Sequence, residues 1–199
     1  MPNTATLTKD SPVVRRAIRT LAREMRRHHR ETADHSHRLA RLARGVADHM
    51  GLDPMASTEV ELVAVLHDVG KLAVDQALLD HVGPLDDLQR HIMRRHTIQG
   101  EEILVQVAGL EHLGILVRAT HEWWDGTGYP DGLSGTDIPL EARIVGAADA
   151  YDAMTSDRAY RKAFSPEEAC RRIERDAGRQ FDPLVAAALL EVACAPPGA

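Results

Sequence analysis

The hydrophobic positions recur with a helical period along nearly the whole chain. Apolar side chains at 3- and 4-residue spacing form a stripe from Leu39 to Met50, and Gly51 then ends it in the manner of a C-terminal cap. A second stripe, on a basic segment over residues 15–30, consists of Val14, Ile18, Leu21 and Met25. No segment alternates apolar and polar residues for long enough to predict a sheet. The pattern predicts an all-α protein.

Local signals predict where several helices begin. Thr58 with Glu61 resembles a capping box ahead of an apolar run. Ser165 followed by Pro166, and Asp182 followed by Pro183, each combine a capping side chain with proline at the first helical position. Residues 123–139 hold four glycines and show no helical period, which predicts a long irregular loop. Loops of this length within a compact domain are usually functional or mobile.

Length and composition indicate one folded domain. The chain has 199 residues, of which 44% are hydrophobic, so it can bury a sizeable core. Aromatic residues make up only 4%, and aliphatic side chains must therefore fill that core. We expect residues 1–11 to form a flexible tail and residues 12–199 to form a single helical bundle.

Net charge and cysteine content limit the kinds of binding partner and the cellular compartment that we expect for the protein. A net charge of -6 argues against a polymeric nucleic acid as partner, although metal ions can still attract a nucleotide. No apolar run reaches the ~18 residues of a membrane span, and the N-terminus lacks the order of a signal peptide. We therefore predict a cytoplasmic protein with Cys170 and Cys194 as reduced, helix-packed thiols. The basic segment is interpreted as a solvated face, with a homodimer contact or a lid over an anionic substrate as alternatives.

Several side chains have the chemistry of a metal site. His67 and Asp68 are adjacent, so both can face one ion if their helix ends or bends there. Glu31 and His35 are four residues apart and share a helix face. With the distant Asp149, they can form a nitrogen-and-oxygen site contributed by several helices. A ligand set without thiolates suits iron, manganese or a similar first-row ion.

These residues fall in an ordered series of motifs. His67-Asp68-Val69-Gly70-Lys71 is followed by His96-Thr97, then by a block from Thr120 to Pro130 that contains Gly128-Tyr129-Pro130, and then by Asp149. The chain resembles the HD-GYP family of metal-dependent phosphohydrolases, a type associated with bacterial cyclic di-GMP hydrolysis. The resemblance extends over residues 31–183. One position departs from it, because the family usually carries two adjacent histidines where this chain has Thr120-His121.

The resemblance implies a role for each matching residue. His35, His67, Asp68 and Asp149 would hold one metal ion, and His96 and His121 would hold a second, with Asp68 bridging the two. Glu31 matches a ligand that some members use for a further metal. Asp68 and Lys71 would be catalytic, Lys71 by offsetting charge on the phosphate. Tyr129, Arg158 and Arg161 would contact the substrate.

The implied activity is hydrolysis of a cyclic dinucleotide, first of all cyclic di-GMP, to a linear dinucleotide or GMP. One alternative is a phosphohydrolase of the same fold that acts on another nucleotide or phosphate ester. The other is a catalytically degenerate module that binds a cyclic dinucleotide or a protein. The full ligand set argues against degeneracy, whereas Thr120 leaves it open.

Thr120 also bears on the number of metals. A threonine hydroxyl is a poor replacement for imidazole, so we expect two divalent ions and doubt a third site. In the alternative, Thr120 faces away from the metals and packs in its helix.

Four neighbouring residues have open interpretations. We interpret Asp152 as a helix-surface residue, slightly in preference to an outer partner of the metal site. Glu122 orients a histidine or is structural. Trp124 is interpreted as a packing anchor of the loop, and Trp123 as a contact to a partner, to a base or merely to the loop.

Overall fold

The protein is a bundle of α-helices. A computed structural model describes residues 11–157 and 162–194, without the side chains of residues 30–34. Its helices are α1 (Pro12–His28), α2 (Arg30–His49), α3 (Pro54–Leu66), α4 (Gln76–Leu79), α5 (Asp87–Arg94), α6 (His96–Leu104), α7 (Glu111–Arg118), α8 (Leu140–Thr155), α9 (Pro166–Arg175) and α10 (Pro183–Ala193), with three short 3-10 helices, η1 (Val69–Ala73), η2 (Ala119–His121) and η3 (Gly135–Asp137). Within the described ranges the only extended pairing is an isolated bridge between Ala177 and Phe181. The prediction of an all-α fold is confirmed.

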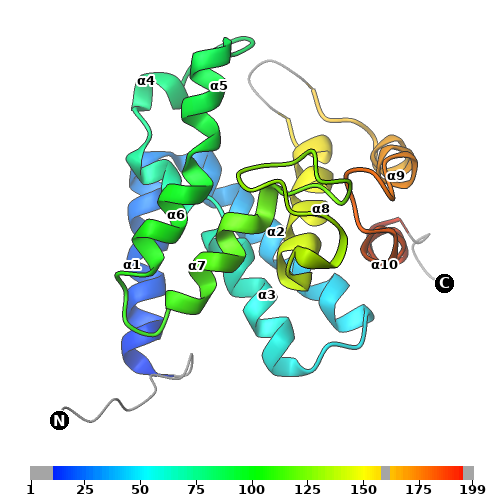
Figure 1. Cartoon of the computed structure of the whole chain (residues 1–199), viewed down its shortest axis with the longest axis horizontal. Coiled ribbons are helices and arrows are strands. Elements are labelled where there is room, and N and C mark those ends of the chain that lie inside the picture. Colours follow the sequence, from blue (N-terminus) through cyan, green and yellow to red (C-terminus); the bar gives the residue numbers. More distant parts are fainter. Residues whose placement is uncertain (1–10, 158–161, 195–199) are drawn as a thin grey trace.

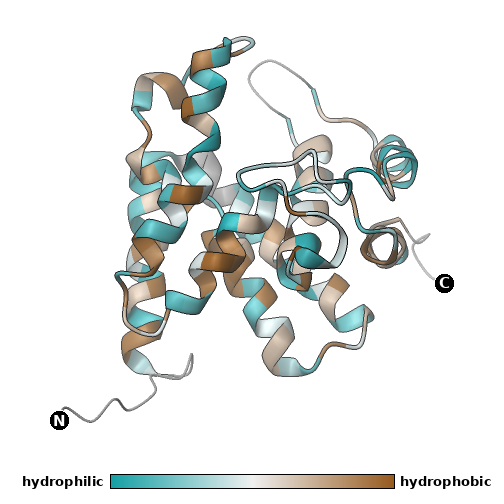
Figure 2. Cartoon of the chain, in the orientation of Figure 1, coloured by the Kyte–Doolittle hydropathy of each residue, from teal (hydrophilic) through white to brown (hydrophobic). Residues whose placement is uncertain are grey.

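Helix α2 organises the bundle. It packs against α1, α3, α8 and α10, and α6 packs against α7 and η1 (Figure 1). The predicted stripes pack in the core, where Leu39, Val46 and Val14 are fully buried. Their other members Ile18, Leu21, Leu42 and Met50 are partly buried against it. Most helices carry both teal and brown stretches in Figure 2, as amphipathic helices around a shared core should. No helix in the described residues is long and apolar enough to cross a membrane.

Helix starts agree with the sequence at two of three predicted places. Ser165 and Asp182 cap α9 and α10, each followed by proline. The prediction at Thr58 is wrong, because α3 already begins at Pro54. Asp53 caps that start by accepting from two backbone N–H groups, and Thr58 lies one turn inside the helix, where its hydroxyl donates to the Pro54 carbonyl at 2.7 Å. An Asp-Pro start one turn earlier supplied the stronger signal.

The two cysteines form a disulfide, so the prediction of reduced thiols is wrong. Cys170 in α9 and Cys194 after α10 are bonded, with their Cα atoms 6.4 Å apart. Helices α9 and α10 pack against each other, which brings together two residues that are 24 positions apart in sequence. Cysteine chemistry therefore no longer supports a cytoplasmic location, and that location stays a prediction.

The predicted loop after residue 122 is confirmed as irregular apart from η3. It crosses the bundle between α7 and α8 and is tied to the segment before α10 (Figure 1). The Trp124 backbone N–H donates to the Gln180 carbonyl at 3.1 Å, and its carbonyl accepts from Gly135 N at 2.9 Å. The Arg143 guanidinium lies 5.6 Å from the centre of the Trp124 ring. Trp124 anchors the loop, as predicted.

Two predicted features lie outside the described residues. The flexible tail does so except for Ser11, whose side chain caps α1 and therefore belongs to the folded domain. The substrate-binding residues Arg158 and Arg161 also fall outside.

Candidate metal centre

The end of α3 presents His67 and Asp68 to the interior. The helix ends at Leu66, and Asp68 has φ −98° and ψ 9°, from which the chain turns into η1. His67 and Asp68 are almost fully buried. The helix ends at this pair, which is the condition under which both side chains can face one ion, and the turn allows them to point in one direction.

Gly70 allows η1 to approach α6 very closely. A Cβ atom at this position would lie 1.8 Å from the His96 carbonyl oxygen and 2.5 Å from the Gly100 nitrogen. Only glycine fits such a backbone contact. The close approach brings His96, at the start of α6, beside Asp68.

Asp68 lies at the centre of the cluster. Its Oδ2 is 2.7 Å from Lys71 Nζ and 3.3 Å from His67 Nε2, and its Oδ1 is 3.5 Å from His96 Nε2. Burial raises the pKa of Asp68, but the nearby His67 and Lys71 outweigh burial and hold the pKa well below its usual value. The carboxylate is therefore ionised, with its two oxygens facing different histidines.

Backbone carbonyls orient two of the imidazoles. His67 Nδ1 donates to the Ala64 carbonyl at 2.8 Å, and His96 Nδ1 donates to the Met93 carbonyl at 2.7 Å. Each Nε2 is therefore left to face the cluster. Burial lowers the pKa of His96 to about 3, with the adjacent His121 adding to the effect, so this imidazole is neutral. Its Nε2 is buried and has no hydrogen-bond partner in the described residues.

His35 connects α2 to α8. Its Nε2 is 2.9 Å from Asp149 Oδ1, and its Nδ1 donates to Asp152 Oδ2 at 2.6 Å. Burial lowers the pKa of His35, but the hydrogen bonds to Asp149 and Asp152 outweigh it and raise the pKa to about 9. A proton held between carboxylates occupies the kind of environment that a metal cation would favour.

Asp152 is a buried partner of His35, so its preferred interpretation as a surface residue is wrong. It also accepts two hydrogen bonds from Arg38, at 3.0 and 3.1 Å. Asp149 and Asp152 are three residues apart on α8, and both face α2 because α2 and α8 pack together. The contact of Arg38 with α8 depends on that packing.

The opposite side of the cluster is formed by His121. Its ring lies 5.0 Å from the ring of His96 and stacks on Tyr129, with centroids 5.1 Å apart. Burial lowers the pKa of His121. Burial and the charges of Asp68 and Asp149 raise the pKa of Tyr129, so its phenol stays protonated.

Thr120 does not face the cluster through its hydroxyl. The residue is buried, and its Oγ1 donates to the Val117 carbonyl at 2.8 Å. This contact matches the alternative in which Thr120 packs in its helix. His121 is then the residue of the pair that is directed at the cluster.

Glu122 holds the loop rather than a histidine. One carboxylate oxygen, Oε1, accepts from the backbone nitrogens of Asp131 at 2.6 Å and Gly132 at 3.1 Å. Of its two open interpretations, the structural one matches these contacts.

Arg94 is a residue at the site that the sequence reading missed. Its guanidinium lies 5.0 Å from the centre of the Tyr129 ring, which itself stacks on His121. The only signal in the sequence was its place two residues before His96.

The donor set fits a pair of metal ions. Ligand atoms of His35, His67 and Asp68 lie within 4.8 Å of one another, as do those of Asp68, His96 and His121. Asp68 belongs to both groups, and Asp149 adjoins the first through His35. The orphaned Nε2 of His96 indicates a missing electrophilic partner. The side chain of Glu31 lies outside the described residues, so its predicted role as ligand stays a prediction.

The raised pKa of His35 predicts a pH-dependent metal affinity. At pH 7 a proton occupies His35, since its pKa is about 9, and a metal ion must displace it. Affinity should therefore rise about tenfold per pH unit below pH 9 and level off above it. Titration of Mn²⁺ into metal-free protein between pH 6 and 9.5 measures this slope. A flat profile would contradict proton displacement.

Asp152 is expected to support metal binding through His35. Asp152→Asn keeps the size of the side chain but removes the charge that orients the imidazole, so metal affinity should fall about 10- to 100-fold. Equilibrium dialysis against Mn²⁺ measures the change. Asp48→Asn is the matched control. Asp48 is a half-exposed carboxylate on α2 that pairs with Arg44 and not with a candidate ligand. Equal affinity in both variants would rule out the role of Asp152.

Comparison with known proteins agrees with this fold. A family model described as HD domain matches residues 16–185, so the chain belongs to the HD-domain family. Its curated relatives are named as cyclic di-GMP or 3'3'-cGAMP phosphodiesterases, and one structural neighbour is named as an HDG"Y"P protein. The resemblance read from the motifs is confirmed.

Three curated relatives illustrate the similarity. A cyclic di-GMP phosphodiesterase of Thermotoga maritima is 38% identical over 164 residues, covering 81% of this chain and 45% of that protein. The cyclic di-GMP phosphodiesterase response regulator RpfG of Xanthomonas campestris pv. campestris is 38% identical over 181 residues, covering 88% and 47%. A 3'3'-cGAMP-specific phosphodiesterase of Vibrio cholerae is 35% identical over 158 residues, covering 79% and 34%. The chain spans less than half the length of these relatives.

Solved structures show the same fold. Bd1817, an HDG"Y"P protein of Bdellovibrio bacteriovorus, matches with a TM-score of 0.65 at 22% identity over 81% of this chain and 52% of that chain. The HD domain of PgpH from L. monocytogenes, solved in complex with cyclic-di-AMP, matches with a TM-score of 0.63 at 19% identity over 86% and 93%.

Proposed function

We propose that this chain is a metal-dependent phosphodiesterase that hydrolyses a cyclic dinucleotide, first of all cyclic di-GMP, to a linear dinucleotide or GMP. The observation that carries the proposal is a buried, ionised Asp68 whose two oxygens face separate groups of histidines. The names of the relatives support this choice of substrate. One relative acts on 3'3'-cGAMP, which makes that dinucleotide the second candidate.

Two divalent ions, iron or manganese, would be held at this site. His35, His67, Asp68 and Asp149 would hold one, and Asp68, His96 and His121 the other, with Glu31 as a further candidate ligand. Such ions lower the pKa of a coordinated water and neutralise charge on phosphoryl oxygens. The described contacts supply no reason to place a third ion at Thr120, whose hydroxyl is used by Val117.

Side chains of the protein would orient the substrate and offset the negative charge of its phosphate. Lys71 donates to Asp68 and is partly exposed, so its ammonium can face both the carboxylate and a phosphate beside it. Tyr129 forms the wall over His121 and would contact the substrate. Contacts from Arg158 and Arg161, a homodimer and a cytoplasmic location remain predictions.

Replacing Lys71 tests the division of roles. Lys71→Ala should retain both metal ions and lower kcat about 10- to 100-fold. The substitution removes a positive charge that stabilises the transition state more than the bound substrate. Metal analysis beside steady-state kinetics separates the two effects. Lys71→Arg preserves the charge and should keep more of the activity. Wild-type turnover in Lys71→Ala would refute the catalytic role.

A substrate panel tests the proposed function. Protein loaded anaerobically with Fe²⁺, or with Mn²⁺, is incubated with cyclic di-GMP, 3'3'-cGAMP and p-nitrophenyl phosphate, and a chelated sample serves as control. We expect cleavage of cyclic di-GMP in the metal-loaded samples alone. Tight binding without cleavage would favour the degenerate module, and turnover of the monoester alone would favour a different phosphohydrolase.

A further inference from the structure

The disulfide between Cys170 and Cys194 closes a helical hairpin of α9, a turn and α10. The two cysteines are 24 positions apart, and the turn joins the helices at the opposite end of the hairpin from Cys194. In the turn, the backbone N–H groups of Arg179 and Gln180 donate to the Asp176 carbonyl at 3.1 and 2.9 Å. The turn is therefore a compact extension of the C-terminal end of α9.

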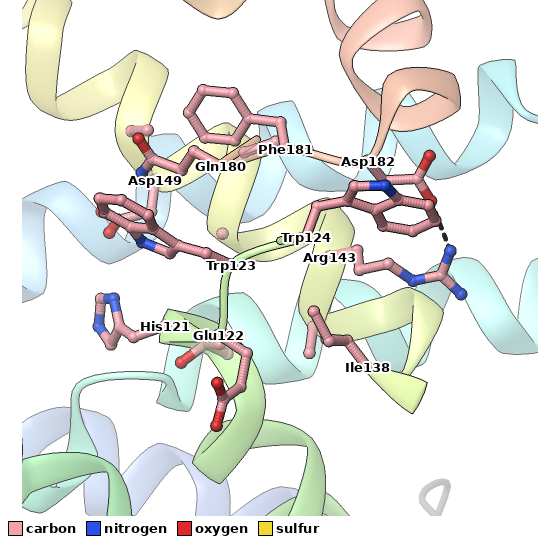
Figure 3. A pocket seen from close by; sticks show the side chains of 15 residues that line it. His121, Glu122, Trp123, Trp124, Ile138, Arg143, Asp149, Gln180, Phe181 and Asp182 are labelled. Carbon is pink, nitrogen blue, oxygen red and sulfur yellow. Dashed lines mark hydrogen bonds and ion pairs between the residues drawn. The ribbon is translucent and has the colours of Figure 1, made fainter. Parts of the chain in front are cut away.

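This turn holds the irregular loop between η2 and α8. The backbone N–H groups of Trp124 and Asp125 donate to the carbonyls of Gln180 and Arg179, at 3.1 and 2.9 Å. Figure 3 shows the loop leaving His121 and reaching the segment that contains Gln180. A cavity of about 150 Å³ lies between the loop, this segment and α8. Because atoms that line a cavity lack packing partners on one side, the two hydrogen bonds are a main attachment of the loop here.

Packing alone holds α9 weakly. Among its ten residues, all of them described, Ala169 and Ile173 are the two that are buried. In α10, by comparison, four residues are buried. Elements with few buried apolar contacts open at a low cost in free energy. The disulfide is therefore a major constraint on α9, and α9 is the half of the hairpin that would loosen without it.

Reducing agents can reach the disulfide. Both Cys170 and Cys194 are partly exposed, and exposed disulfides exchange more readily with thiols than buried ones. A dithiol that reduces the bond gives two electrons and two protons to the cysteine sulfurs and becomes a disulfide itself. A small disulfide such as oxidised glutathione accepts the same electrons and protons when the bond forms again. The bond can therefore be made and broken reversibly by thiol–disulfide exchange.

We propose that the Cys170–Cys194 bond is a redox-sensitive link that controls how firmly the loop is held over the candidate metal centre. In the oxidised protein the hairpin is fixed, and the turn carbonyls accept from the loop. Reduction frees α9, so the turn shifts and the hydrogen bond to Trp124 opens. The same loop carries Tyr129, whose ring stacks on His121, so its release reaches the metal-ligand cluster. Release of the loop goes beyond the proposed function, and only its effect on hydrolysis rests on that function.

Hydrogen exchange of the wild type in its two redox states tests the link. Protein is reduced with a dithiol, separated from it under anaerobic conditions, and compared with oxidised protein by mass spectrometry of peptides. The amides of Trp124 and Asp125 should exchange at least about tenfold faster after reduction, because their hydrogen bonds open. Oxidised glutathione should restore slow exchange, and amides of α3 are the internal control. Unchanged exchange at Trp124 and Asp125, or equal acceleration in α3, would overturn the proposal.

A serine variant separates the bond from the reductant. Cys194→Ser should show fast exchange at Trp124 and Asp125 without any reductant, and the dithiol should cause no further change. Its Tm should fall by roughly 6–12 °C, because a disulfide that closes a loop of this length constrains the unfolded chain. A lower Tm with slow exchange at Trp124 and Asp125 would show a purely structural disulfide and overturn the link.

Hydrolysis separates this inference from the proposed function. At equal metal content, the reduced enzyme should cleave cyclic di-GMP with a kcat/KM about tenfold lower, because an ordered loop completes the site. Redox-dependent exchange in a protein that cleaves no dinucleotide supports the link and refutes the function. Equal cleavage in both redox states, with unchanged exchange at Trp124 and Asp125, refutes the link and leaves the function intact.

Discussion

Asp68→Ala should abolish metal binding and lower cyclic di-GMP hydrolysis at least about a thousandfold. The carboxylate is the one group shared by both sets of candidate ligands. Its removal also leaves Lys71 and His67 without their ionised partner in the interior. Both metal positions should therefore fail together, in contrast to the partial loss expected from Asp152→Asn.

Elemental analysis of the purified variant, beside the rate of product formation, measures the effect of Asp68→Ala. Asp68→Asn is a companion of the same size, which retains one oxygen donor and so tests whether charge is required. Circular dichroism confirms that each variant is folded. Two bound metal ions in folded Asp68→Ala would refute the bridging role.

Gly70→Ala should strongly destabilise the protein and disrupt the site. The added methyl group would overlap the His96 carbonyl and the Gly100 nitrogen, which are backbone atoms that cannot move aside by rotation. We expect a loss of about 3 kcal/mol or more in the free energy of unfolding. For a domain of this size, that loss corresponds to a fall in Tm of roughly 6–12 °C.

Gly45→Ala is the matched control for this prediction. Gly45 lies inside α2, where a new Cβ would meet only Val192 Cγ1 at 3.4 Å. The substitution should leave stability unchanged or raise it by about 0.5–1 kcal/mol, because alanine favours a helix interior. Thermal unfolding of both variants gives the comparison. A Tm of Gly70→Ala equal to that of the control would contradict the close approach of η1 and α6.

Sequence periodicity predicted α1 and α2 because each buries a stripe of apolar side chains with a helical repeat. The proline starts of α9 and α10 were also predictable, since a capping side chain followed by proline is a local signal. Thr58 misled because a capping-box pattern inside a helix resembles one at its start. An Asp-Pro pair four residues earlier had the stronger claim.

Features that depend on the packing of helices could not be predicted from local sequence patterns. Asp152 looked like a surface residue because no local pattern shows that α8 faces α2 there. The bond between Cys170 and Cys194 depends on the packing of α9 against α10. The motifs predicted His35, His67, Asp68, His96, His121 and Asp149 as a set, and the described fold brings all six side chains together.

Stepwise addition of metal to metal-free protein tests the central claim most directly. Cyclic di-GMP hydrolysis is measured under anaerobic conditions after each fraction of an equivalent of Fe²⁺ or Mn²⁺. The arrangement of ligands around Asp68 predicts that activity reaches its full value at two equivalents per chain. Full activity without added metal, or no hydrolysis after two equivalents are bound, would contradict a two-metal phosphodiesterase.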